Sequence, residues 1–123
     1  MRTFGLDLNG DGACILRRMI RLSVMYPVSS GSKFDWSYYL GPHVVLARKL
    51  LTPLGLLGIE IDRGLGALPP GAPPHFHAIG HLFFLSMEEL DRAMAETAPA
   101  LIADQQKYFN GESIVQISEV VKT

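Results

Sequence analysis

The chain has 123 residues, of which 48% are hydrophobic and 19% are charged, and its formal net charge is −1. This length and balance predict a single folded domain with its own core and exclude a disordered chain. The near-neutral charge gives no electrostatic footprint for nucleic acid or for an anionic membrane surface, so neither is expected as a partner. No apolar run approaches the roughly 20 residues that cross a bilayer. With Cys14 as the single cysteine, an internal disulfide is excluded and a cytoplasmic location is expected.

Residues 1–18 differ in composition from the rest of the chain. Glycines and the polar residues Asp7, Asn9 and Asp11 interrupt every apolar stretch, which is not the pattern of a secretory signal. The same residues imitate the start of a calcium loop, but Arg18 stands where such a loop needs a bidentate glutamate. We therefore expect residues 1–18 to be a flexible leader whose removal leaves thermal stability nearly unchanged. Residues 19–123 are expected to form the domain.

Alternating apolar and polar residues predict four strands. The alternation is clear from Ile20 to Tyr26, and again from Gly58 to Arg63. His75 to Leu85 and Ser113 to Val121 are the third and fourth predicted strands. The glycine- and proline-rich residues 64–74 cannot join a sheet interior, and they form either a flap over a site or, as we favour, a slack hairpin.

Two helices are predicted between these strands. Asp35 is a suitable N-cap for a helix that runs to about Leu51. Ser86 and Glu89 form a capping box for the second helix, which reaches about Tyr108 and is expected to kink or restart near Pro99. The order strand, helix, strand, strand, helix, strand predicts a ferredoxin-like βαββαβ α+β sandwich, with both helices on one face of a four-stranded antiparallel sheet.

The most informative stretch is FDWSYYLGPH, residues 34–43, at the start of the first helix. Residues at three- and four-residue steps predict one buried stripe along this helix: Trp36, Tyr39, Leu40, His43, Val44, Ala47, Leu50 and Leu51. A protonatable ring on a buried stripe needs a partner or a chemical role. We expect His43 to be neutral at pH 7, with a tyrosine hydroxyl or water as its partner, because Asp35 is committed to capping.

This stretch resembles the pattern of the EthD family: an aromatic residue before Asp35, the pair Tyr38–Tyr39, and His43 four residues after the second tyrosine. The segments GHLFFLSMEEL (80–90) and VQISEV (115–120) resemble that family's third strand with its second helix, and its last strand. The resemblance covers about residues 19–121. The family often follows its histidine with Pro-Leu, whereas Val44 and Val45 stand here, and we therefore expect an unkinked helix.

The resemblance implies that His43 is a catalytic acid or base, although a histidine on an apolar stripe is more often a hydrogen-bonded core residue. The predicted substrate-binding residues are Tyr26, Trp36, Tyr38, Tyr39 and His81. His81 is equally compatible with a structural place on the polar face of the sheet. No metal is expected, because no carboxylate or cysteine completes a ligand set with His75, His77 and His81. No cofactor is expected either, because no glycine-rich nucleotide loop follows a strand.

The EthD family takes its name from the degradation of ethyl tert-butyl ether, where such a protein accompanies an oxygenase system. The resemblance thus implies an association with oxidoreductive catabolism of small organic molecules and a homodimer of the dimeric α+β barrel type. Three roles remain open: acid–base catalysis on an apolar or aromatic ligand, a non-catalytic accessory that shields such a ligand for a partner oxygenase, and a structural dimer without a ligand. Fold alone does not decide among them. Met25, Ile79 and Phe83, on the sheet face away from the helices, are expected to support a sheet-to-sheet dimer.

Overall fold

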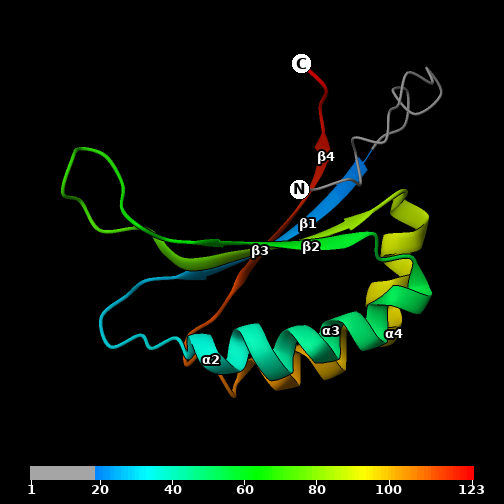
Figure 1. The fold of residues 1–123 in the computed structure, drawn as a ribbon, viewed down its shortest axis with the longest axis horizontal. Coiled ribbons are helices and arrows are strands. Elements are labelled where there is room, and N and C mark those ends of the chain that lie inside the picture. Colours follow the sequence, from blue (N-terminus) through cyan, green and yellow to red (C-terminus); the bar gives the residue numbers. More distant parts are fainter. Residues whose placement is uncertain (1–18) are drawn as a thin grey trace.

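Four strands form one antiparallel sheet in the computed structural model, which describes residues 19–123. The strands are β1 (Met19–Pro27), β2 (Gly58–Arg63), β3 (Phe76–Phe84) and β4 (Ile114–Val120), and their order in the sheet is β2-β3-β1-β4. The two long helices lie side by side on one face of this sheet (Figure 1). The architecture confirms the predicted ferredoxin-like α+β fold. The expectations for residues 1–18 lie outside the described part of the chain.

The strand register decides which side chains face the helices. Val24 of β1 lies opposite Gly80 of β3 and Val115 of β4. Because directly paired residues share a face, these three positions all turn toward the helices. The neighbouring residue Ser23 lies opposite His81, and this pair occupies the other face of the sheet. The sheet therefore has one face that packs under the helices and one that carries the polar residues of the central strands.

The first helical region is interrupted where a regular helix is predicted. It consists of α2 (Trp36–Tyr38), a π-helical turn η1 (Tyr39–His43), α3 (Val44–Leu51) and a closing 3₁₀ turn η2 (Thr52–Leu54). Pro42 lies inside η1 and has no N–H to donate to the carbonyl four residues back. The N–H of Val44 instead reaches the carbonyl of Tyr39, five residues back, which is the π pattern. The helix is therefore not regular, because the expectation of an unkinked helix considered the residues after His43 and not Pro42 before it.

Burial along the first helical region follows the predicted stripe in part. The stripe drawn at α-helical spacing holds for some of its residues and not for others. Leu40 was predicted to lie on the buried stripe, but 49% of it is exposed. Tyr39, Ala47 and Leu51 are buried as predicted.

The second helix, α4, runs without a break over Met87–Gln105. Its N-cap is confirmed, since the Ser86 hydroxyl accepts a hydrogen bond from the Glu89 N–H at 3.1 Å. The predicted restart near Pro99 is wrong, because Pro99 lies inside one continuous helix. Pro99 faces solvent, where water can satisfy the carbonyl that its missing N–H leaves unpaired.

The core has an aliphatic part and an aromatic part. The aliphatic part joins the sheet to α3 and α4 through buried residues that include Leu22, Leu51, Phe84 and Leu90. The aromatic part lies at the opposite end, and its buried members are Tyr26, Tyr39, Ala78, Tyr108 and Phe109. Searched over residues 19–123, no helix is long and apolar enough to span a membrane.

Candidate ligand cavity and its hydrogen-bonded histidine

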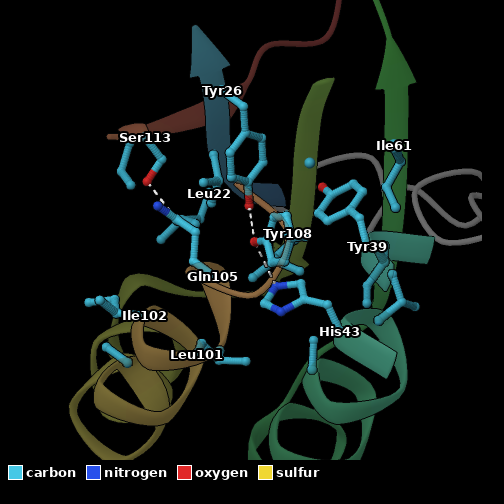
Figure 2. A pocket seen from close by; sticks show the side chains of 18 of the residues that line it. Leu22, Tyr26, Tyr39, His43, Ile61, Leu101, Ile102, Gln105, Tyr108 and Ser113 are labelled. Atoms are coloured by element: carbon cyan, nitrogen blue, oxygen red, sulfur yellow. Dashed lines mark hydrogen bonds between the residues drawn. The ribbon is translucent and has the colours of Figure 1, made fainter. Parts of the chain in front are cut away.

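A cavity of about 330 Å³ lies between the helix-facing side of the sheet and the helices. All four strands, the first helical region and α4 contribute to its wall (Figure 2). Most of the wall is aliphatic, with the following residues: Leu22, Val24, Val44, Ala47, Ile59, Ile61, Leu82, Met94, Ala98, Leu101, Ile102 and Val115. A space of this volume is large enough for several water molecules or for a small organic molecule. A space of this size is therefore expected to hold ligand or water.

The cavity reaches the surface between α4 and β4. Two lining residues there, Ile102 and Val115, are 63% and 54% exposed, so the wall is open at this point. Among the described residues that line the cavity, none is Lys, Arg, Asp or Glu. An unpaired charge buried against such a wall would lose its hydration without compensation. The cavity consequently favours an uncharged and largely apolar molecule.

His43 enters this cavity from the end of the π-helical turn, and each of its ring nitrogens has a partner. Nδ1 lies 2.9 Å from Asp104 Oδ2, and Nε2 lies 3.2 Å from the hydroxyl oxygen of Tyr108. The imidazole also packs against Tyr39 and Tyr108, with ring centroids 5.7 Å and 4.6 Å away. These contacts fix both the position and the orientation of the ring.

Asp104 is the acidic partner of His43, from which it is 61 residues distant in sequence. It is 8% exposed and also accepts a hydrogen bond from the Tyr38 hydroxyl at 2.8 Å. Burial alone would raise the pKa of the Asp104 carboxyl, but the hydrogen bonds from His43 and Tyr38 outweigh burial and hold the pKa below its usual range. Asp104 is thus a carboxylate at neutral pH, and it accepts the Nδ1–H of His43. This tautomer places the lone pair of a neutral imidazole on Nε2.

The hydrogen-bonded chain continues from His43 into the aromatic core. The hydroxyl oxygens of Tyr108 and Tyr26 lie 2.6 Å apart (Figure 2). With the Nε2 lone pair as acceptor, Tyr108 donates to His43 and Tyr26 donates to Tyr108. Burial is the main cause that raises the pKa of both phenols far above the ordinary value, so both stay protonated near neutral pH. The result is a continuous chain, Tyr26–Tyr108–His43–Asp104–Tyr38.

Tyr39 depends on a glycine in the adjacent strand. A Cβ at Gly80 of β3 would collide with the Tyr39 hydroxyl, so the absence of a side chain lets the ring lie across the sheet. Tyr39 has little room to move, because the rings of Tyr26, Phe34 and Tyr108 surround it at centroid distances of 5.5, 4.9 and 5.0 Å. Gly80 therefore shapes the wall beside His43.

Comparison with solved structures places the fold in a family context. An EthD-like protein from Ralstonia eutropha JMP134 is 31% identical in sequence and has a TM-score of 0.79, and the match covers 87% of this chain and 96% of that one. This chain belongs to the EthD-like family. A second EthD-family protein, from Bacillus halodurans C-125, is 22% identical over 84% of this chain and 99% of its own, with a TM-score of 0.67.

More distant similarity extends beyond the EthD-like proteins. SnoaB from Streptomyces nogalater, described as a cofactor-independent oxygenase, is 6% identical, with a TM-score of 0.55 over 87% of this EthD-like chain and 96% of its own. At that identity the likeness shows a shared fold alone. No protein-family model matches the sequence, and no curated protein matches it significantly.

The structure brings together some of the residues predicted for the site of this EthD-like chain and separates others. His43, Tyr26 and Tyr39 line the cavity. Trp36 lies outside the lining and packs under the Arg63 guanidinium, whose carbon is 3.9 Å from the ring centroid. Tyr38 also lies outside the lining. It contacts the site through its hydrogen bond to Asp104 and through its ring, which stacks on Tyr108 at a centroid distance of 6.2 Å.

His81 lies on the opposite face of the sheet from the cavity. Its Nδ1 is 2.8 Å from the Ser23 hydroxyl, and its Nε2 is 3.0 Å from Asp62 Oδ2. These partners match the structural alternative for His81, a polar position on the outer face of the sheet. In the part of the chain that the structure describes, no three His, Cys, Asp or Glu side chains are grouped to hold a metal ion.

Sequence reasoning missed two members of the hydrogen-bonded chain, Asp104 and Tyr108. The partner expected for His43 was a tyrosine hydroxyl or water, and the tyrosine is Tyr108 rather than one of the residues near the first helix. A usable signal was present in the second helix. Leu90, Ala93, Thr97 and Leu101 follow three- and four-residue steps, and the same steps continue to Asp104 and Tyr108. An acidic residue on an otherwise buried stripe indicates a buried partner.

Proposed function

We propose that this EthD-like protein binds a small, uncharged and largely apolar molecule in the cavity, and that His43 acts on it as an acid or base. The observation that carries the proposal is the arrangement of His43 between the Asp104 carboxylate and the cavity. A carboxylate on Nδ1 orients the imidazole and stabilises the imidazolium that forms when Nε2 takes a proton. The ring thus has a defined tautomer and an oriented basic nitrogen beside an apolar binding space.

The contact between Nε2 and Tyr108 is the longest in the chain, at 3.2 Å, against 2.6–2.9 Å for the others. A ligand proton can take the place of the Tyr108 proton at Nε2, since contacts of this kind are often loose before a ligand binds. With an enolisable ketone, Nε2 takes the α-proton and the electron pair of the C–H bond moves onto the carbonyl oxygen as an enolate. The Tyr108 hydroxyl, released from Nε2, then donates a hydrogen bond to that oxygen. Return of a proton to carbon completes the exchange.

A second candidate function is a non-catalytic accessory that shields an apolar intermediate for a partner oxygenase. The observation that favours it is that both nitrogens of His43 already have protein partners, so the chain is complete without a ligand. The EthD-like family assignment supports an association with oxidoreductive breakdown of small organic molecules in either case. The two functions differ in whether a proton moves on the bound molecule.

Hydrogen exchange into a bound ketone tests the proposal. The probe is 2-tetralone in D₂O, with loss of its α-proton signals followed by NMR against the buffer rate. We expect the protein to accelerate exchange, and we expect His43→Gln to abolish the acceleration, because an amide cannot accept a proton near neutral pH. The matched control is His75→Gln, since His75 is exposed and does not line the cavity. Binding of the ketone without acceleration would refute the catalytic role and favour the accessory.

A further inference from the structure

Two polar side chains that line the cavity, Gln105 and Ser113, take no part in the hydrogen-bonded chain of His43. Gln105 lines the cavity immediately after Asp104 on α4, at the side where Ser113 approaches from the segment before β4. The Ser113 hydroxyl donates a hydrogen bond to Gln105 Oε1 at 2.9 Å. Figure 2 shows Gln105 and Ser113 together on one side of the cavity, with His43 on another side and Tyr108 between them.

This contact with Ser113 determines what the Gln105 amide can offer. Because the amide oxygen is already bound, the remaining hydrogen-bonding capacity of the side chain is the pair of Nε2–H donors. Among the described residues, none accepts a hydrogen bond from Gln105 Nε2. This atom is also not among the buried atoms that lack a partner, so it is accessible to solvent. These donors are therefore available to water or to a molecule in the cavity.

We propose that Gln105 determines ligand specificity by donating a hydrogen bond from Nε2 to an acceptor oxygen of the ligand. The ligand class is then an uncharged, largely apolar molecule that carries a carbonyl or ether oxygen positioned to meet Gln105. This inference rests on the proposed function, because it takes the cavity to be the ligand site. It adds a second polar contact, separate from His43, that sets the orientation of the molecule.

The discrimination follows from the apolar character of the remaining wall. A ligand that fills the cavity displaces the water that otherwise accepts from Nε2, so a ligand without an acceptor leaves these donors unpaired. A site built around a polar contact rejects analogues that lack the matching group more strongly than an apolar wall rejects a change of size. We expect a preference of about tenfold, which corresponds to about 1.4 kcal/mol.

Two probes of the same shape test this inference. They are 2-acetylnaphthalene, which carries a carbonyl, and 2-isopropenylnaphthalene, in which a methylene replaces the oxygen. Isothermal titration calorimetry with the full chain is expected to give a Kd about tenfold lower for the acetyl compound. In Gln105→Leu this preference is expected to disappear while the isopropenyl compound still binds. Gln105→Met, which keeps the length of the side chain and has no N–H donor, is also expected to lose the preference.

Controls separate this inference from the proposed function and from loss of folding. Gln106→Leu makes the same change one residue later at an exposed position, and it is expected to keep the preference. His43→Gln is also expected to keep it, because Gln105 acts independently of the proton transfer. Tight binding of both probes without a preference, or a preference unchanged in Gln105→Leu and Gln105→Met, would overturn this inference and leave the ligand site standing. Binding of neither probe would overturn both.

Discussion

Replacing the Asp104 carboxylate by a carboxamide is the sharpest test of the hydrogen-bonded chain. Asp104→Asn keeps the size of the side chain but removes the charge that accepts from His43 and Tyr38. A hydrogen bond to a charged group contributes about 1.5–3 kcal/mol, and one between neutral groups about 1 kcal/mol. The carboxamide keeps one oxygen acceptor, so we expect the free energy of unfolding to fall by about 2 kcal/mol at neutral pH. In a domain of this size that corresponds to a Tm lower by roughly 6–12 °C.

The pH dependence of this loss distinguishes the carboxylate from a merely space-filling group. The pKa of Asp104 is depressed in the folded protein, so its stabilising contribution is fully present above the unfolded-state value of about 3.9. That contribution is lost as pH falls through the folded-state pKa of Asp104. Below it, the protonated Asp104 side chain is uncharged, as is the carboxamide of Asp104→Asn. The difference in unfolding free energy between the native chain and Asp104→Asn should therefore shrink between pH 5 and pH 2.5.

Urea unfolding followed by circular dichroism at several pH values measures this difference. Asp91→Asn is the matched control, since Asp91 lies on the same helix and is exposed, and its effect is expected to stay within about 0.5 kcal/mol. Comparing variant with native chain at each pH cancels the titration of the other acidic groups. A loss that is equal at pH 5 and pH 2.5, or no loss at pH 5, would refute the assignment of Asp104 as a charged partner of His43.

Two further predictions concern the glycine beside Tyr39 and the state of association. Gly80→Ala is expected to lower the free energy of unfolding by about 1–3 kcal/mol, because the added methyl meets a Tyr39 ring that its neighbours hold in place. Thermal unfolding of Gly80→Ala and of the control variant Gly41→Ala checks this prediction. The methyl added at Gly41 meets no atom within 4 Å other than its own helix backbone and chain neighbours. Equal melting temperatures of the two variants would contradict the prediction. Light scattering at micromolar concentration is expected to give the mass of a dimer, because Ile114, Val115 and Ile117 leave β4 apolar and about half exposed. Phe83, which was expected to support that dimer, is buried within the single chain, with 5% of it exposed. A monomeric mass would therefore show that the remaining apolar surface is too small for association.

The sequence by itself determined the fold of this protein. Strand alternation and helix capping are local properties, set by residues two to four positions apart, and they can be read without knowing the rest of the chain. The predicted strand from Gly58 to Arg63 agrees with β2, and both predicted N-caps, Asp35 and Ser86, accept the expected backbone hydrogen bonds. The position of His43 on the inner side of its helix follows from the same local spacing.

Only the tertiary structure decided what His43 contacts and where the predicted binding residues lie. Asp104 and Tyr108 are 61 and 65 residues from His43, and the packing of α4 and the turn after it beside the first helical region brings them within hydrogen-bonding distance. Leu40 is half exposed although the helical spacing places it on the buried stripe, and the strand register turns His81 away from the cavity. Spacing along a chain fixes which face of an element a residue occupies. Which side chain meets it from another element depends on how the elements pack, and that packing is a property of the whole chain.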